Sequence, residues 1–532
     1  MSRNATGVLI VGTGIAGLCA ALTASASGRQ ITLITKTADP TESNTRYAQG
    51  GIVDLGVEDS PGLLAEDITK AGDGICNPAA VDLVVREGPR LVHELLIDQV
   101  GVEFSTDRNG RLDYTREAAH SRKRILHYYD MTGLEIERKL LDRVRDIPNV
   151  CIRTGCTAID LITTHHNTTN HLLHYRPNRC LGCHALDNRT GQVHTLLADA
   201  TVLATGGIGR LYQYTTNPPS ATADGISMAY RAGAEVINME YVQFHPTVFY
   251  TEGGEGFLIS ESVRGEGGRL INRDGEPFME RYSPQWKDLA PRDEVARAIY
   301  TEMARTGSSH VLLDVAGSYR GEVPLRERFP GIYRECLKHK VDLETEPIPV
   351  VPAEHYFCGG VLVGERGRTT LPGLWVVGEA SCSGVHGANR LASVSLLESL
   401  VYGVRAGAAA AEEPGHADLF DDMEDWIYPS RAQESSQHDP LLVLQDWNVL
   451  RSTMWSYVGI IRTQARLQRA VSDLRNLHTR VSDYYRDTPP TRERVELRNG
   501  ITVATMIAES ARRNRRTTGC HYLEDGTRGP GC

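Results

Sequence analysis

The chain opens with a short apolar run that leads directly into a glycine-rich loop. Val8–Val11 has the character of a buried strand, Gly12-Thr13-Gly14-Ile15-Ala16-Gly17 follows it, and small residues predict a helix as far as Ala26. Ile31–Ile34 predicts the next strand. In this context the first glycine permits a tight turn, the second lets the backbone approach a pyrophosphate, and the third lets helix and strand pack closely. The opening therefore predicts a βαβ unit that binds a dinucleotide.

Later residues indicate which dinucleotide is bound. Thr35-Lys36 stands where an acidic residue normally holds a ribose, and the lysine would suit the 2′-phosphate of NADP. However, glycine turns also follow two later apolar strands, at Gly206-Gly207 after Thr201–Leu203 and at Gly378, which precedes Glu379. A cofactor contacted by turns this far apart in the sequence is long, which favours FAD over a nicotinamide cofactor.

The length of 532 residues exceeds what one hydrophobic core supports, so several folding units are expected. The predicted fold is α/β, a Rossmann-like FAD-binding domain with an inserted α+β capping domain and a C-terminal helical domain. Helical periodicity over Leu441–Leu474 and Arg492–Arg513, with a break at Pro489-Pro490, indicates the last of these. The predicted limits are 1–238 with 352–418 for the discontinuous FAD-binding domain, 239–351 for the capping domain and 419–532 for the helical domain.

The charge balance limits the partners. A formal net charge of -10 disfavours nucleic acid and anionic membranes, so an anionic substrate must meet a local basic cluster. The start of the chain lacks the pattern of an export signal, and the apolar stretch Leu396–Ala411 contains Glu398 and Arg405, so no membrane segment is expected. Eleven scattered cysteines fit free thiols in a reducing cytoplasm, which is the predicted location.

One cysteine pattern has the spacing of a known cofactor-attachment motif. Cys180-Leu181-Gly182-Cys183-His184 matches the form used for covalent haem attachment. That chemistry normally needs export, and the alternating residues that lead to Gln192-Val193-His194 favour a hairpin strand instead. No second Cys or His pair stands at a distance convincing for zinc, and His165–His174 favours a polar surface loop, so no metal site is expected.

Six ordered motifs over nearly the whole chain resemble the flavoprotein subunits of succinate dehydrogenase and fumarate reductase together with the L-aspartate oxidases. Beyond the N-terminal glycine loop, the motifs are Thr45–Gly51, Phe244–Thr247, Val263–Gly268, Pro291–Asp293, His355-Tyr356 and Gly378–Glu398. The tail segments Met454–Arg462 and Gly519–Tyr522 are similar to those of the oxidases, although Arg516–Gly519 replaces their Glu-Ser-Arg-Gly.

The resemblance implies the FAD contacts. They are Gly12, Thr13, Gly14, Ile15, Ala16, Gly17, Lys36, Ser43, Asn44, Thr45, Arg46, Tyr47, Ala48, Gln49, Gly50, Asp224, Glu379, Ser395 and Leu396. The respiratory members attach the flavin to a histidine between serine and threonine, and Asn44 occupies that position here. An amide has no nucleophilic ring nitrogen, so FAD is expected to be noncovalent. Val394 replaces the asparagine that is common in the family.

The resemblance also implies a site for a four-carbon dicarboxylate. The substrate-binding residues would be Glu117, His245, Arg264, His355 and Arg390, with Arg292 as the catalytic proton donor or acceptor. Arginine suits this task because its planar fork grips carboxylates with two hydrogen bonds. Glu261 and Asp293 are expected to relay the proton.

The segment Thr115–Ser121 is similar to the Arg-Glu-Gly-Gly-His-Ser segment of L-aspartate oxidases, with Ala118-Ala119 in place of both glycines. Glu117 would then face the substrate ammonium, a contact that a succinate site does not need. The implied reaction is oxidation of L-aspartate to iminoaspartate, with reoxidation by O2, giving H2O2, or by fumarate, and a product used by quinolinate synthase on the path to NAD. The alternatives are a soluble fumarate reductase and a flavin-dependent binding protein without activity.

Overall fold

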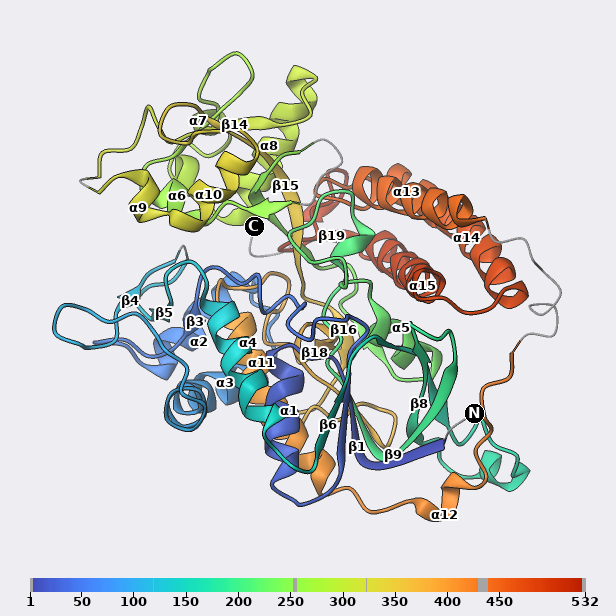
Figure 1. Ribbon diagram of the computed structural model, residues 1–532. Coiled ribbons are helices and arrows are strands. Elements are labelled where there is room, and N and C mark those ends of the chain that lie inside the picture. Colours follow the sequence, from blue (N-terminus) through green and yellow to red (C-terminus); the bar gives the residue numbers. More distant parts are fainter. Residues whose placement is uncertain (1–2, 118, 252–255, 322, 429–438, 529–532) are drawn as a thin grey trace.

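The N-terminal βαβ unit has the predicted form. In the computed structural model, which describes residues 3–117, 119–251, 256–321, 323–428 and 439–528, strand β1 (Arg3–Val11) leads into helix α1 (Ile15–Ser25) and strand β2 (Ile31–Ile34) (Figure 1). β1 and β2 are parallel, with Val8 opposite Ile31. The strand begins five residues earlier than its apolar part, since backbone pairing with a later strand extends it.

The main sheet gathers strands from distant parts of the chain. Its order is β6-β2-β1-β9-β8-β7, and β17 pairs with the end of β9. The later strands are β6 (Val150–Arg153), β7 (Cys156–Thr163), β8 (Cys180–Asp187), β9 (Val193–Leu203) and β17 (Leu374–Val376). β17 is parallel to β9, and helix α11 (Val394–Ala411) packs against α1. One unit is therefore built from both sides of a long intervening segment.

A second sheet forms from that intervening segment, at the upper left of Figure 1. Its order is β12-β11-β15-β14-β13, with antiparallel neighbours, and the strands are β11 (Val242–Phe249), β12 (Phe257–Leu258), β13 (Arg269–Ile271), β14 (Val311–Asp314) and β15 (Ile348–Phe357). Buried apolar residues between Phe249 and Val350 form a core of their own. This separate core supports an inserted capping unit, whose limits at 239 and 351 remain a prediction.

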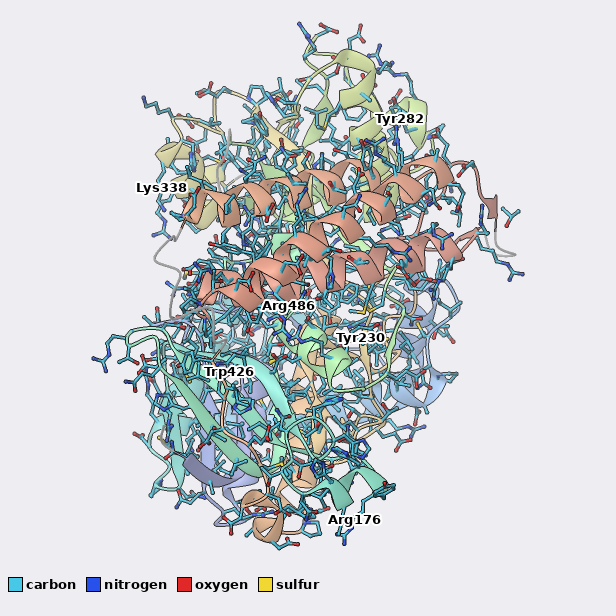
Figure 2. The ribbon with its side chains drawn as sticks, turned by 90° about the vertical axis from the view of Figure 1, so that its right-hand side faces the viewer. Arg176, Tyr230, Tyr282, Lys338, Trp426 and Arg486 are labelled. Atoms are coloured by element: carbon cyan, nitrogen blue, oxygen red, sulfur yellow. The ribbon has the colours of Figure 1, made fainter. Side chains whose placement is uncertain are left out.

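The C-terminal helices lie at the right of Figure 1 and cross the middle of Figure 2, with the capping unit above them and strands of the main sheet below them in that view. They are α13 (Pro440–Tyr457), α14 (Gln464–Asp487) and α15 (Arg492–Arg513). Asp439, Thr463 and Thr491 cap them by accepting backbone N–H groups of the first turns. The predicted helix over Arg492–Arg513 and the break at Pro489-Pro490 are confirmed. The periodic stretch Leu441–Leu474 is divided between two helices, because the chain turns at Gly459 and restarts at the Thr463 cap.

The remaining elements complete these units or connect them. The helices are α2 (Pro61–Ala71), α3 (Pro78–Leu91), α4 (Thr132–Arg145), α5 (Asp224–Arg231), α6 (Glu261–Gly265), α7 (Met279–Tyr282), α8 (Arg292–Thr306), α9 (Leu325–Arg328), α10 (Pro330–Lys338) and α12 (Ala417–Phe420). The short strands are β3 (Ile52–Val53), β4 (Tyr114–Thr115), β5 (Ile125–Leu126), β10 (Val236–Ile237), β16 (Gly360–Leu362), β18 (Ser381–Cys382), β19 (Arg516–Thr517) and β20 (Thr527–Arg528). Within the described ranges, no helix has both the length and the apolar character needed to cross a membrane.

Candidate active site

The glycine loop after β1 is packed so closely at Gly12 and Gly17 that no side chain fits at these two positions. Gly12 has a φ of +115°, and a Cβ atom there would lie 2.1 Å from the carbonyl oxygen of Ala204. At Gly17 a Cβ would lie 2.0 Å from the Gly12 oxygen. Gly14 offers no side chain to cap α1, while Thr45 Oγ1 accepts the Ile15 N–H at 3.1 Å. A helix N-terminus approached by bare backbone suits a pyrophosphate.

A cavity of about 780 Å³ extends from this loop to side chains of the capping unit. Its lining includes eighteen of the nineteen predicted cofactor residues, and the exception, Gly17, takes the predicted role of close helix packing. The lining residues are Gly12, Thr13, Gly14, Ile15, Ala16, Lys36, Ser43, Asn44, Thr45, Arg46, Tyr47, Ala48, Gln49, Gly50, Asp224, Glu379, Ser395 and Leu396. The volume, the glycine cradle and the helix terminus together fit FAD.

Asn44 is fixed by two partners. Its Nδ2 donates to Asn217 Oδ1 at 2.9 Å and to Glu379 Oε2 at 2.8 Å. Burial raises the pKa of Glu379 to about 7, while the Phe357 N–H and the Asn44 amide oppose the shift. Asn44 therefore presents an amide with two hydrogen bonds and no nucleophilic ring nitrogen.

Lys36 is not available for a 2′-phosphate. Its Nζ lies 2.6 Å from Asp224 Oδ2 and 2.8 Å from Glu496 Oε1, a residue of α15. Two carboxylates already pair with the charged amine, so it is not free to bind a 2′-phosphate. The interpretation of Lys36 as an NADP signal is therefore wrong. Lys36 and Asp224 still line the cavity.

Two histidines and two arginines meet in the same cavity. His245 from β11 and His355 from β15 have ring centroids 5.2 Å apart, and Arg292 and Arg390 line the wall with them. Burial, reinforced by nearby arginines, lowers the pKa of both histidines well below the usual range, so both rings are neutral. Thr216 Oγ1 lies 2.8 Å from His355 Nδ1 and orients that ring. The remaining positive charge of this cluster resides on the arginines.

Arg292 begins helix α8 and is bound by Glu261. Its Nε donates to Glu261 Oε2 at 2.6 Å. Burial alone would lower the pKa of Arg292, but Glu261 and Glu117 raise it above the usual range, so the resting pair is ionised. Asp293 pairs instead with Arg297, one turn along the same helix, at 2.8 Å. Glu261 is thus placed to exchange a proton with Arg292, whereas Asp293 contacts Arg297 and its part in a proton relay stays a prediction.

Within the part of the chain that the structure describes, Arg390 forms no ion pair with a carboxylate. Its guanidinium lies 4.6 Å from the Tyr356 ring centroid, and Nη1 donates to Ser395 Oγ at 3.2 Å. The aromatic face stabilises the cation without occupying the donors of its fork. Tyr356 is itself hydrogen-bonded to His386 Nε2 at 3.1 Å, and His386 is bonded to Glu398 at 2.8 Å. Arg390 therefore presents free donors to a carboxylate ligand.

Glu117 places a carboxylate close to these cations. Its Oε2 accepts from Ser393 Oγ at 2.7 Å, and the group packs so closely on Gly50 that a Cβ there would lie 2.5 Å from Oε1. Burial raises the pKa of Glu117, and Arg292 opposes the shift. The adjoining Ala119 has a φ of +67°, a conformation that suits the glycine of related sequences, while Ala118 lies outside the described residues.

Arg264 and Val394 occupy different surroundings. Arg264 does not line the cavity: it is 1% exposed, and its Nη1 donates to the Asp288 carbonyl at 2.6 Å. Its charge still acts on the site. Burial raises the pKa of Glu261, but Arg292 and, to a smaller extent, Arg264 lower it below the usual value.

Val394 is fully buried in the main apolar core at the start of α11, so a polar contact is absent there.

Some lining residues carried no recognisable sequence signal. Thr216 and Asn217 come from a loop without a motif, and α10 contributes Arg334 and Lys338 at a position that periodicity alone does not locate. Ser393 lies within the Gly378–Glu398 motif and could have been included from it.

The cysteine and histidine patterns form no metal site among the described residues. Cys180 and Cys183 lie buried in β8, which pairs antiparallel with β9, so the predicted hairpin is confirmed. All ten described cysteines are free.

Comparison with known proteins agrees with this geometry. The family described as FAD binding domain matches residues 7–396, and the family described as fumarate reductase flavoprotein C-term matches residues 447–528. An L-aspartate oxidase of Ralstonia nicotianae is 42% identical, covering 97% of this chain and 95% of the relative; one of Halobacterium salinarum is 43% identical, covering 98% and 96%. A structure of E. coli quinol fumarate reductase superposes with a TM-score of 0.87 at 28% identity, covering 99% and 93%. The chain therefore belongs to the L-aspartate oxidase family, within the succinate dehydrogenase and fumarate reductase flavoproteins.

Proposed function

We propose that this protein oxidises L-aspartate to iminoaspartate. One observation carries the assignment: the Glu117 carboxylate lies in the same cavity as the Arg292 and Arg390 guanidinium groups and His355. Cations bind the two carboxylates of a four-carbon acid, and a carboxylate binds an ammonium. L-Aspartate carries both kinds of group, whereas succinate and fumarate lack the ammonium.

Each residue has a distinct task in this proposal. Arg390, His245 and His355 bind the substrate carboxylates, Glu117 binds the ammonium, and Arg264 supports Glu261 from outside the cavity wall. FAD, held noncovalently beside Asn44, would accept a hydride from the substrate α-carbon and would be reoxidised by O2, giving H2O2, or by fumarate, giving succinate. Arg390 and Glu117 grip opposite charges, so they fix the orientation of the α-carbon.

Arg292 and Glu261 transfer the proton in this proposal. Because the resting guanidinium is protonated, Arg292 can donate at once, as fumarate reduction requires. In the direction of aspartate oxidation, Arg292 receives a proton only as Glu261 takes one from its Nε, across the 2.6 Å hydrogen bond. Glu261 is therefore proposed as the second proton carrier.

The biological setting follows from the product. Iminoaspartate is the substrate of quinolinate synthase, so we propose a functional link to that enzyme in the synthesis of NAD. The cytoplasmic location remains a prediction, supported by the ten free cysteines.

Steady-state turnover tests the assignment. L-Aspartate should give H2O2 in air and should drive fumarate reduction without oxygen. A soluble fumarate reductase is the second candidate, favoured by the protonated Arg292 beside Glu261. Fumarate reduction by a reduced dye without any aspartate oxidation would favour that candidate, and the absence of both activities would contradict both.

A further inference from the structure

The amine of Lys36 joins the βαβ unit to the C-terminal helices. Nζ donates to Asp224 Oδ2 and to Thr222 Oγ1, each at 2.6 Å, and pairs with Glu496 Oε1 at 2.8 Å. Lys36 and Asp224 line the cofactor cavity, whereas Glu496 belongs to α15 and does not. Glu496 is 8% exposed. A nearly buried ionic contact therefore links the cavity wall to a helix about 460 residues away in sequence.

Asn499 holds the second oxygen of Asp224. One turn after Glu496 on α15, Asn499 is fully buried, and its Nδ2 donates to Asp224 Oδ1 at 2.9 Å. The two side chains of α15 thus act on the two halves of one ion pair. Helix α15 packs against α5, which begins at Asp224 (Figure 1), and Tyr230 near the end of α5 lies below the C-terminal helices (Figure 2).

The charges in this cluster balance. Arg492 Nε binds Glu496 Oε1 at 2.9 Å, so two cations face two carboxylates. Burial would lower the pKa of Lys36, but Asp224 and Glu496 raise it above the usual range and keep the amine charged. Removing the Glu496 charge would leave Lys36 with Asp224 as its remaining ionic partner and would let the amine shift toward it.

We propose that Glu496 and Asn499 are positioning residues for FAD, which fix Lys36 and Asp224 at the wall of the cavity. The C-terminal helical unit then completes a cofactor site that the N-terminal βαβ unit begins. The proposal goes beyond the oxidation of aspartate and rests only on FAD as the cofactor. A purely structural link between the two units would instead change stability without changing FAD affinity.

Titration of the full-length apoprotein with FAD, followed by quenching of flavin fluorescence, tests the proposal. Glu496→Gln keeps the shape of the side chain, and Asn499→Asp places a like charge beside Asp224. Each should raise the Kd for FAD about tenfold, the scale of one charged hydrogen bond. Glu509→Gln is the control, because Glu509 lies on the same helix and pairs with the exposed Arg475 at 2.6 Å. Its Kd should stay within about twofold of the original.

Double substitution separates positioning from simple stabilisation. If Glu496 acts through Lys36, Glu496→Gln should have little further effect on the Kd in a Lys36→Met background. A lower unfolding temperature of the apoprotein with an unchanged Kd in both single variants would overturn the proposal, and so would an equal effect of Glu509→Gln.

Amide hydrogen exchange of the unaltered protein tests the same proposal without variants, and so remains possible if the variants do not fold. Addition of FAD should slow exchange of the amides at 492–500 more than at the far end of α15 near Arg513. Equal exchange of 492–500 with and without FAD would overturn the proposal.

Discussion

Glu117 offers the sharpest test of substrate choice, because its charge should matter for one substrate and not for another. Glu117→Gln keeps the size of the side chain and still accepts the Ser393 hydrogen bond seen at 2.7 Å. The close packing on Gly50 is also preserved, since the amide replaces the carboxylate atom for atom. The substitution therefore removes a negative charge and little else.

The magnitude follows from the contact that is lost. A hydrogen bond between a carboxylate and an ammonium contributes about 1.5–3 kcal/mol, and about 1.4 kcal/mol corresponds to a factor of ten. The expected loss in kcat/KM for L-aspartate is therefore about 10- to 100-fold. Fumarate carries no ammonium, and Glu261 still binds Arg292 after the substitution, so fumarate reduction should change less than about threefold. The ratio between the two substrates is the quantity to measure.

Both reactions can be followed with one enzyme preparation. H2O2 formation reports on L-aspartate oxidation, oxidation of a reduced dye reports on fumarate reduction, and flavin absorbance gives the concentration of loaded enzyme. Glu509→Gln serves as the control, since its pairing with Arg475 lies outside the cavity. Equal losses with both substrates would refute the reasoning and would assign Glu117 to the support of the fold or of FAD.

Four further outcomes are expected. Acid precipitation should release all FAD into the supernatant, because Asn44 cannot form a covalent bond; flavin fluorescence in the pellet would contradict this. Arg292→Leu should keep the flavin spectrum and lose at least ~100-fold in turnover, and near-normal rates would reassign its role. Since burial raises the pKa of Glu117, kcat/KM for L-aspartate should fall with decreasing pH already above ~4.3, and Glu117→Gln should flatten this acid limb in a pH profile. Ala119→Gly should relieve a φ of +67° and stabilise the protein by about 1 kcal/mol, seen as a higher midpoint in urea unfolding; an unchanged or lower midpoint would argue against strain.

The sequence predicted best those features that depend on neighbouring residues. The β1–α1–β2 unit and the helix Arg492–Arg513 follow from local periodicity, and the glycine loop has the predicted geometry. The cationic cluster could be assembled only through the resemblance, because its members come from separate elements. Arg264 illustrates the limit: its motif matches the family, yet its side chain turns to the Asp288 carbonyl outside the cavity.

Polar contacts between residues far apart in the chain could not be predicted from the sequence. Lys36 next to a strand end suggested a free charge for a phosphate, and only the fold reveals that Glu496 neutralises it. Likewise, nothing near Asp293 in the sequence separates it from Glu261, and only the fold reveals that Glu261 contacts Arg292 while Asp293 contacts Arg297. Such contacts depend on which elements meet in space, and a single chain does not record that directly.

The divided construction of the FAD-binding unit has a consequence for synthesis. One part of the cavity wall is made at Gly12–Ala16, and another part, at Glu379 and Leu396, follows more than 360 residues later. At about 5–20 residues per second, roughly 20–70 s separate the emergence of these two parts from the ribosome. During that interval the nascent chain carries the glycine loop without a complete cavity around it. Cofactor loading is therefore a late event in the life of the newly made chain, and a prematurely terminated chain would remain colourless.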